Sequence, residues 1–531
     1  MLFVCPGTIH PQTTSSVPHL RKQGTATQLI VHGKPFLMLG GELGNSSASD
    51  LKYMAPLWPK LKAMHLNTVL MPVSWELIEP REGEFEFTLL DDLIASARTH
   101  DLKVVLLWFG SWKNSMSCYA PAWVKRNQER FPRARTKDGR ALEILAPFSD
   151  GNRNVDAGAF ARLMKHLREI DGKQNSVVMV QVENEIGMIP EARDHSDLAE
   201  QAFAGQVPAE LLAYLQKNRD SLTEEVARAW SGTGRKTSGT WEQVFGQGLL
   251  TDEIFMAWHF ARYTNSVAQA GKKEYPLPMY VNAALIRPNY KPGEYPSAGP
   301  LPHLMDVWRA AAPQIDFLSP DIYFTRFAEW LGKYDRGGNA VFVPEVDRRQ
   351  SVTNAFYAFA RHNAMGYSPF SIESVDDPEG SQLRKGYDVL HQLAPLVLEH
   401  QGKGTMAGFL LDSAAQIAEV QLGGYTFTVK HEETWPYAPR SAGETPRFGG
   451  MIVMTGKDEF LVAGSGVLIT FQTSSGDGSI AGILSIDEGE FVNGKWVAGR
   501  RLNGDEDHQG RHLHLPGGAY GIQKLRLYRY K

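Results

Sequence analysis

The 531-residue sequence contains only two cysteines, Cys5 and Cys118, and it lacks a long apolar run. Two cysteines cannot supply the disulfide framework of a small secreted domain, and their spacing is not that of a zinc site. Without a stretch of about eighteen apolar residues, no membrane-spanning segment is expected. The opening MLFVC has neither the basic start nor the apolar length of a signal peptide. The compartment therefore stays open: periplasmic or extracellular if a leader has been removed, and cytoplasmic otherwise.

The sequence also lacks an excess of charge of either sign. Its 55 basic and 59 acidic residues give a net charge of −4, and the basic residues are spread along the chain. This distribution argues against nucleic acid or an anionic membrane as a partner. The 16 histidines contain no H-E-x-x-H motif, and the pair His512 and His514 has no third ligand beside it. We therefore expect no metal and no cofactor.

Eight short apolar runs alternate with amphipathic stretches between about residues 35 and 395. They lie at 35–41, 67–73, 103–110, 177–184, 278–285, 316–323, 340–346 and 367–374. Uninterrupted apolar runs suit parallel strands that are buried on both faces. Apolar residues at helical spacing predict helices over 89–97 and 160–170, with Asp156 as the cap of the second. Eight such β/α units indicate a (β/α)8 barrel, the TIM barrel.

A change of pattern near residue 400 predicts a second domain. Helical periodicity fades there, and β-type segments separated by Gly and Asp turns follow, as in an antiparallel β-sandwich. We expect an N-terminal segment at 1–34 packed on the barrel, the barrel at 35–395 with a helical insertion at about 192–270, and the sandwich at 400–531. The sandwich is expected to brace the barrel or a homo-oligomer interface rather than to bind polysaccharide.

Acids, amides and aromatic residues recur at the ends of the predicted strands. They include Glu42, Trp75, Glu76, Trp112, Lys113, Asn114, Asn184, Glu185, Asn282, Asp321, Tyr323, Glu345 and Glu373. Active sites of such barrels form at the carboxyl ends of the strands. In the run VVMVQVENEIG at 177–187, a predicted buried strand is followed at once by two acids, Glu183 and Glu185. A buried carboxylate must be paired or hydrogen-bonded, or its pKa must rise.

Glu185 and Glu345 end the fourth and seventh strands, which lie on opposite sides of a barrel mouth. Retaining glycosidases use two carboxyls about 5–5.5 Å apart, one as nucleophile and one as acid/base. The pair therefore fits retaining hydrolysis of a glycosidic bond. Asn184 is expected to bind a sugar hydroxyl next to the reacting carbon, and Tyr323 is expected to hold the nucleophile ionised.

Several neighbouring residues have a structural alternative. Glu42 either contacts sugar hydroxyls or bridges to an arginine, and Glu183 is assigned to structural support. Three tryptophans are either sugar platforms or core residues: Trp75, Trp108 and Trp112. The rivals of Glu345 for the nucleophile role are Asp321, Asp347 and Glu373.

Three runs carry a resemblance to a known family. The stretch LNTVLMPVSWELIEPREGEFEF at 66–87, the QVENE-x-G run at 181–187 and GGE at 40–42 resemble signatures of the family 35 β-galactosidases, retaining enzymes built on (β/α)8 barrels. The C-terminal part resembles the accessory domain of a bacterial subgroup, some members of which act on galactose side chains of xyloglucan. SWELIEP is also similar to family 42 β-galactosidases, which share the clan and the mechanism.

The resemblance implies roles for particular residues. Glu185 would be the acid/base and Glu345 the nucleophile, with Asn184 on the 2-hydroxyl and Tyr323 supporting Glu345. The better-known members continue their third strand into a GPY-x-x-x-E run, whereas this chain reads FGSWKNS. Trp112, Lys113 and Asn114 are therefore expected to line the sugar site instead.

The resulting expectation is an exo-β-galactosidase that hydrolyses carbohydrate substrates with retention. Another retaining exo-glycosidase, a β-glucosidase or an α-L-arabinopyranosidase, is the nearest alternative. A metal-dependent sugar isomerase and a non-catalytic sugar-binding protein are more remote alternatives. The mechanism requires Glu185 to hold its proton near the working pH, so we expect donors around Glu345 and a less polar setting for Glu185.

Overall fold

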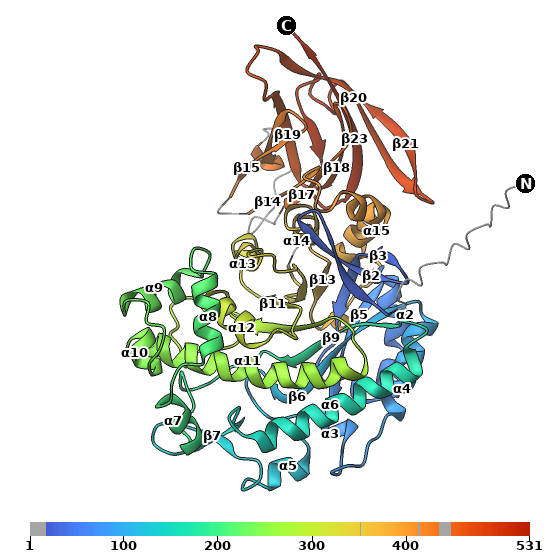
Figure 1. Ribbon diagram of the computed structural model, residues 1–531. Helices are drawn as coiled ribbons and strands as arrows, with labels where there is room; N and C mark the ends of the chain where they lie inside the picture. Colours follow the sequence, from blue (N-terminus) through green and yellow to red (C-terminus); the bar gives the residue numbers. More distant parts are fainter. Residues whose placement is uncertain (1–16, 351, 413–414, 435–447) are drawn as a thin grey trace, which may run out of the picture.

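The computed structural model describes residues 17–350, 352–412, 415–434 and 448–531. Figure 1 shows a helix-wrapped barrel that carries a smaller, all-β part on one side. Residues 1–16 of the predicted N-terminal segment, with Cys5, lie outside the described residues. From there on the segment forms a three-stranded antiparallel sheet of β1 (His19–Gln23), β2 (Ala26–Val31) and β3 (Lys34–Phe36). Lys103 and Asn175, at the starts of two barrel strands, contact His32 of this sheet, so the sheet covers the amino-terminal end of the barrel.

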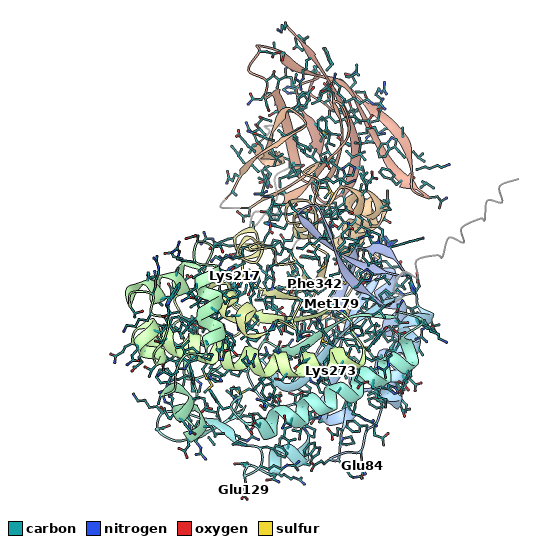
Figure 2. The ribbon with its side chains drawn as sticks, in the orientation of Figure 1. Glu84, Glu129, Met179, Lys217, Lys273 and Phe342 are labelled. Atoms are coloured by element: carbon teal, nitrogen blue, oxygen red, sulfur yellow. The ribbon has the colours of Figure 1, made fainter. Side chains whose placement is uncertain are left out.

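The centre of the molecule is a closed barrel of eight parallel strands, so the predicted fold class is confirmed there. The strands are β4 (Met38–Glu42), β5 (Thr68–Ser74), β6 (Lys103–Lys113), β9 (Val177–Asn184), β10 (Met279–Ala284), β11 (Phe317–Ile322), β12 (Val343–Val346) and β13 (Gly366–Pro369). Each of the eight predicted apolar runs corresponds to one of them. Met179 and Phe342 lie at the centre in Figure 2 and belong to one buried apolar cluster. The barrel is therefore a packed core, and its chemistry must lie at a rim.

Helices surround the barrel. The two predicted from periodicity are α4 (Thr88–Thr99) and α6 (Asp150–Asp171). The others outside the insertion are α1 (Leu51–Met54), α2 (Leu57–Ala63), α3 (Trp75–Ile78), α5 (Ala122–Arg126), α12 (Met305–Ala311), α13 (Phe327–Tyr334), α14 (Thr353–Arg361) and α15 (Gln382–His400). The prediction that Asp156 caps α6 is wrong. Ser149 caps it by accepting a hydrogen bond from the amide of Asn152, and Asp156 lies wholly buried further along the helix.

The segment between β9 and the next barrel strand, β10, is largely helical. It consists of α7 (Asp197–Phe203), α8 (Ala209–Lys217), α9 (Glu224–Gly232), α10 (Trp241–Phe245) and α11 (Leu249–Glu274). A small antiparallel pair, β7 (Arg133–Arg135) and β8 (Ala141–Leu145), precedes α6. Helix α11 packs along α6, and α7 to α10 lie together at the edge of the barrel in Figure 1. The insertion thus enlarges one side of the molecule without interrupting the sheet.

The C-terminal part consists of two antiparallel sheets, as predicted for a β-sandwich. One has the order β14-β17-β18-β23-β20-β21 and the other β15-β16-β19-β22. Their strands are β14 (Met406–Leu411), β15 (Ile417–Leu422), β16 (Tyr425–His431), β17 (Phe448–Gly456), β18 (Glu459–Ser465), β19 (Val467–Thr473), β20 (Ile480–Val492), β21 (Lys495–Leu502), β22 (Leu513–Leu515) and β23 (Gly521–Tyr530). Ile452 and Val462 pack between the sheets, whereas Met451 and Val453 belong to the apolar cluster that the barrel strands form with their surrounding helices. This alternation is the period of a strand buried on both faces.

In the described part of the chain, no helix combines the length and the apolar character needed to span a membrane.

Candidate active site

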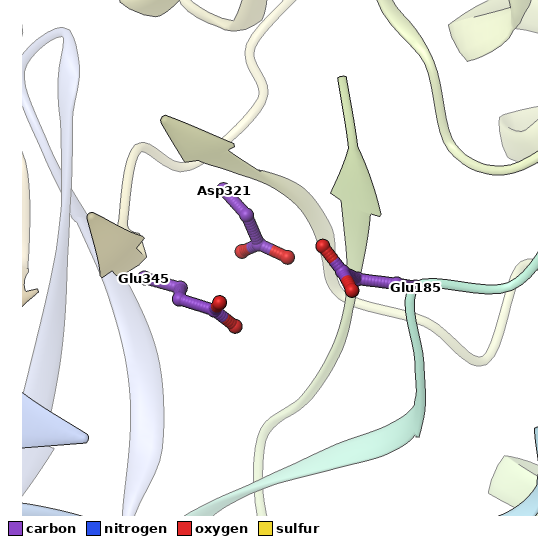
Figure 3. Close-up of side chains that lie close together, drawn as sticks. All are labelled: Glu185, Asp321 and Glu345. Carbon is purple, nitrogen blue, oxygen red and sulfur yellow. The ribbon is translucent and has the colours of Figure 1, made fainter. Parts of the chain in front are cut away.

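Three buried carboxyls meet at the carboxyl ends of the barrel strands. Figure 3 shows Glu185, Asp321 and Glu345, which follow or end β9, β11 and β12. They are 5%, 1% and 4% exposed, and one oxygen of each lies within 4.8 Å of an oxygen of the other two. Parallel strands bring their ends to the same rim, which is why residues 185, 321 and 345 become neighbours. The sequence prediction that acids converge here matches this geometry.

The direction of Glu185 depends on a break in strand alternation. A regular strand would place Glu183 and Glu185 on the same face. Glu183 and Glu185 instead adopt left-handed backbone angles, with φ of 63° and 44°. Glu183 turns behind the strand, where it accepts the backbone N–H of Trp112 at 2.8 Å, and Glu185 joins the other carboxyls in the mouth. Left-handed angles at non-glycine residues cost about 1–3 kcal/mol each and cluster at functional sites.

Polar partners surround the Glu185 carboxyl. The Asn114 side chain donates a hydrogen bond to Glu185 Oε2, and Lys113 Nζ lies 3.9 Å from the same oxygen. The backbone N–H of Glu185 donates to Asn282 Oδ1 at 3.0 Å. Burial and the nearby Glu345 raise the pKa of Glu185 to about 7, although Lys113 and hydrogen bonds act in the opposite direction. The largest cause of the raised pKa is therefore burial, followed by the charge of Glu345.

Tyr323 and Glu42 are neighbours of the Glu345 carboxyl. The Tyr323 hydroxyl donates to Glu345 Oε1. Burial, followed by the charge of Glu345, raises the pKa of Glu42 well above its ordinary value. The neutral, protonated form of Glu42 is therefore favoured beside Glu345. Glu42 contacts another carboxyl here and not the arginine that the sequence left open.

Lys113 is the cation of this cluster. Burial alone would lower the pKa of Lys113, but the carboxylates of Glu185, Glu345 and Glu42 outweigh burial and raise it. One ammonium faces four carboxyls when Asp321 is included. Neighbouring carboxylates cannot all ionise at such distances, so some of them must hold protons near neutral pH.

Two predicted residues keep unsatisfied polar atoms in this buried setting. Both side-chain polar atoms of Asn184 and the Oε2 atom of Glu345 have no hydrogen-bond partner among the described residues. Asn184 is wholly buried, and the strand that carries it pairs with Lys113. Buried polar atoms in proteins are normally hydrogen-bonded. These atoms are therefore available to the hydroxyl groups of a ligand.

The structure places Trp112 away from the sugar site that we predicted for it. Its ring is wholly buried, packs edge-to-face on Phe260 and Tyr263 of α11, and donates its N–H to the carbonyl of Leu145. Strand alternation explains the correction, because Trp112 and its neighbour Lys113 point to opposite sides of β6. Trp75 and Trp108 are likewise core residues.

The rival acids are engaged elsewhere. Glu373 accepts hydrogen bonds from the amide of Gly44 at 2.8 Å and from the hydroxyl of Ser47 at 2.5 Å, so it braces the loop after β4. Asp347 pairs with Arg349 at 2.6 Å. Of the rivals, only Asp321 lies with Glu185 and Glu345.

A buried network behind the site was not predicted from the sequence. Asp156 accepts hydrogen bonds from the Trp108 indole at 3.0 Å and from the Ser111 hydroxyl at 2.6 Å. After burial, its charge is the largest cause that raises the pKa of the neighbouring Glu183. The strand register shifts between Trp108 and Lys113, so β6 bulges over this network. The network thus fixes the bulged end of β6, which places Lys113 beside the carboxyls of the site. A polar residue on the apolar face of the predicted helix was its only signal in the sequence.

A parallel barrel with paired carboxyls at its mouth is the architecture of a glycoside hydrolase. Residues 57–331, more than half of the chain, match the family described as β-galactosidase, glycoside hydrolase family 42. The chain belongs to this family. Residues 383–514 match a family described as a domain of unknown function, DUF5597.

Individual relatives are similar to parts of the chain. A β-galactosidase of Xanthomonas manihotis is 30% identical over 197 residues, which make up 35% of this chain and only 29% of the relative. The solved β-galactosidase from Bacillus circulans sp. alkalophilus has a TM-score of 0.47 and 16% identity, and the match covers 68% of this chain and 57% of that chain. The catalytic domain of β-amylase from Paenibacillus polymyxa has a TM-score of 0.45 and 12% identity, with coverage of 65% and 94%.

The family match bears on the resemblance drawn from the motifs. The broader prediction, a β-galactosidase family on a (β/α)8 barrel, is confirmed. The matching family is number 42, to which SWELIEP was similar, and the narrower placement in family 35 stays a prediction.

Proposed function

We propose that the protein is a retaining exo-β-galactosidase that releases terminal β-D-galactosyl residues by double displacement. The observation that carries this proposal is the close approach of Glu185 and Glu345, whose nearest oxygens lie within 4.8 Å. Retaining enzymes place their carboxyls about 5–5.5 Å apart, whereas inverting enzymes leave about 6.5–9.5 Å for a water molecule. The close approach of the two carboxyls fits direct attack by one carboxylate on the sugar.

In the first step Glu345 attacks the anomeric carbon and Glu185 protonates the departing oxygen. Tyr323 donates a hydrogen bond that stabilises the negative charge of Glu345. The raised pKa of Glu42 favours a neutral carboxyl beside it, which avoids a second negative charge. Glu185, with its pKa raised to about 7, keeps its proton up to neutral pH. A general acid works best when its pKa lies near the working pH.

In the second step water hydrolyses the galactosyl ester on Glu345, and Glu185 acts as the base. Ester formation removes the negative charge of Glu345, which is one of the two causes that raise the pKa of Glu185. The pKa of Glu185 therefore falls once the ester has formed. Loss of this repulsion lets the same residue serve first as acid and then as base.

We assign the galactose contacts to residues around this pair. The amide of Asn184 would bind the 2-hydroxyl, since both of its polar atoms are buried without partners in the described region. Lys113 and Asn114 would contact further hydroxyls. The more specific substrate that we propose is the galactose side chains of xyloglucan, and this assignment is based on the motif resemblance alone. A β-glucosidase or an α-L-arabinopyranosidase on the same machinery is the alternative.

The first experiment compares wild type with Glu345→Gly on 4-nitrophenyl β-galactoside, with and without azide. We expect the variant to lose activity by about 10³-fold or more, and azide to restore turnover with α-galactosyl azide as the product. Glu185→Ala should instead give β-galactosyl azide, because its nucleophile is intact. The product configuration thus assigns each glutamate its role.

Glu373→Gln is the matched control, because it removes the charge of another buried strand-end acid without touching the pair. Near wild-type activity of Glu345→Gly, or loss of activity only in Glu373→Gln, would contradict the assignment of the nucleophile. If wild type is inactive on the galactoside but cleaves another β-glycoside, the roles of Glu185 and Glu345 are retained and the sugar that the enzyme releases is not galactose.

A further inference from the structure

Asp321 is a third carboxyl in the mouth that the double displacement does not use. It lies directly opposite Glu345 in the parallel register of β11 and β12. Opposed residues of paired strands point to the same face, so both side chains enter the mouth, as Figure 3 shows. Asp321 is 1% exposed. A buried acid at this place requires a compensating partner or a proton.

Asn282 links Asp321 to the backbone of Glu185. The Asn282 side-chain amide donates to Asp321 Oδ2 at 2.6 Å, and its oxygen accepts the backbone N–H of Glu185 at 3.0 Å. Glu185 has a left-handed φ of 44°, so this hydrogen bond holds a strained residue in place. The chain of contacts joins Asp321 to Glu185 through one side chain.

Asp321 also lies directly beside Glu185, because one oxygen of each carboxyl is within 4.8 Å of the other. A hydrogen bond between the two carboxyls requires a proton on one of them. Asp321 Oδ2 already accepts from Asn282, whereas buried Oδ1 has no hydrogen-bond donor among the described residues. A proton on Oδ1 would satisfy this atom and would donate to Glu185.

The charges around Asp321 favour a proton on Asp321 itself. The groups that act on it are Glu42 from β4, Lys113 from β6, Glu185 after β9 and Glu345 from β12, together with the phenols of Tyr280, Tyr323 and Tyr334. Lys113 is the single cation among them, and its ion pair is with Glu185. Burial, followed by the charges of Glu345 and Glu185, raises the pKa of Asp321 well above its ordinary value.

We propose that Asp321 is a positioning residue that stays protonated and donates an Oδ1–H hydrogen bond to Glu185 whenever Glu185 has lost its own proton. This inference rests on the proposed role of Glu185 as acid/base. Burial and Glu345 oppose release of the Glu185 proton, and a neutral donor beside it makes the release easier. The proton of Asp321 is not transferred: the leaving group receives the proton of Glu185, and the attacking water returns one to Glu185.

The test measures kcat/KM against pH for Asp321→Asn and Asp321→Ala on 4-nitrophenyl β-galactoside. The alkaline limb reports Glu185, which must be protonated in the free enzyme. The amide of Asp321→Asn can still donate to Glu185 and accept from Asn282, so its limb should stay near that of wild type. Asp321→Ala removes the donor, and its alkaline limb should move up by about one pH unit. Asp347→Asn is the matched control, with no movement expected.

Two results would overturn the proposal. A downward shift of a unit or more in Asp321→Asn would show that Asp321 is ionised and raises the proton affinity of Glu185. An unmoved limb in a folded Asp321→Ala with reduced kcat would show a merely structural role.

Infrared spectroscopy decides the matter independently of folding of the alanine variant and of activity. The wild type minus Asp321→Asn difference spectrum at pH 7 should contain the carbonyl band of a protonated carboxyl, and absence of the band would refute the inference. If wild type is inactive on every glycoside, the proposed function fails, while the infrared band still shows where the proton lies.

Discussion

Glu183 lies two residues before Glu185, but its side chain affects the stability of the folded protein and is not part of the active site. Burial, then the charge of Asp156, raises the pKa of Glu183 well above its ordinary value. The folded protein therefore holds this proton at pH values where the unfolded chain has released it. This difference destabilises the folded state progressively as pH rises above about 4.3, the ordinary value for glutamate.

We predict that Glu183→Gln relieves this pH dependence. The neutral amide can donate to Asp156 and accept the backbone N–H of Trp112, as the protonated acid does. The melting temperature of the variant relative to wild type should therefore rise between pH 5 and 8, by about 1 °C for each 1 kcal/mol of difference in a chain of this length. Thermal unfolding followed by circular dichroism across this range checks it. If the difference in melting temperature between the variant and wild type is the same at every pH, Glu183 is not protonated in the folded protein.

The sequence allowed single residues to be predicted only where local pattern determines their direction. Glu185, Asn184 and Glu345 end apolar runs, so the fold class alone brings them to one rim. The opposite directions of Glu183 and Glu185 follow from two left-handed backbone angles that no spacing shows. Asp321 was considered only as a rival nucleophile, because its contact with Glu185 depends on the distance between strands.

At the scale of the element, the bulge in β6 depends on a glycine. A Cβ atom at Gly110 would lie 2.3 Å from Trp108 Nε1 and 2.8 Å from Glu183 Oε1. These neighbours belong to the buried network and cannot move independently. Gly158, on an exposed face of α6, has no neighbouring atom within 4 Å of the position that a Cβ atom would take, which makes it a matched contrast.

We predict opposite effects of alanine at these two glycines. Gly110→Ala should destabilise the protein by about 1–3 kcal/mol, because it overpacks the core, and should reduce galactoside hydrolysis through Lys113 and Asn114. Gly158→Ala should stabilise it by up to about 1 kcal/mol, since alanine is the better helix former. Urea unfolding and kcat/KM of both variants provide the measurement. Equal stabilities would contradict the role given to the bulge.

Elements were predictable where composition and periodicity act together. The eight barrel strands are uninterrupted apolar runs, and α4 has apolar residues at helical spacing along one face. The strands and this helix could therefore be predicted from the sequence. The start of α6 was misplaced because Asp156 is a residue type that often caps helices, whereas Ser149 is the actual cap.

At the scale of the whole molecule, the sandwich and the barrel share an apolar core. Met451, Val453 and Leu461 of the larger sheet belong to the same buried cluster as the barrel residues. Helix α14 contacts β14 and β17, and Phe356 of α14 stacks on Tyr520 with ring centroids 5.8 Å apart. The sequence showed two patterns of periodicity but could not show that alternate residues of one sheet face two different cores.

This shared core makes the sandwich a brace of the barrel, and Met451→Asp tests it. The Met451 side chain is wholly buried against the barrel, so an unpaired carboxylate there should cost at least about 3 kcal/mol and lower the temperature at which hydrolysis is lost. Leu484→Asp places the same charge on a strand of the same sheet, at a side chain that is 64% exposed, and should change stability by less than about 0.5 kcal/mol. Calorimetry and residual activity after heating are measured on both variants. Met451→Asp could lower the unfolding temperature of the sandwich while hydrolysis persists up to the same temperature as in wild type. In that case the two parts unfold independently, and the sandwich does not stabilise the barrel.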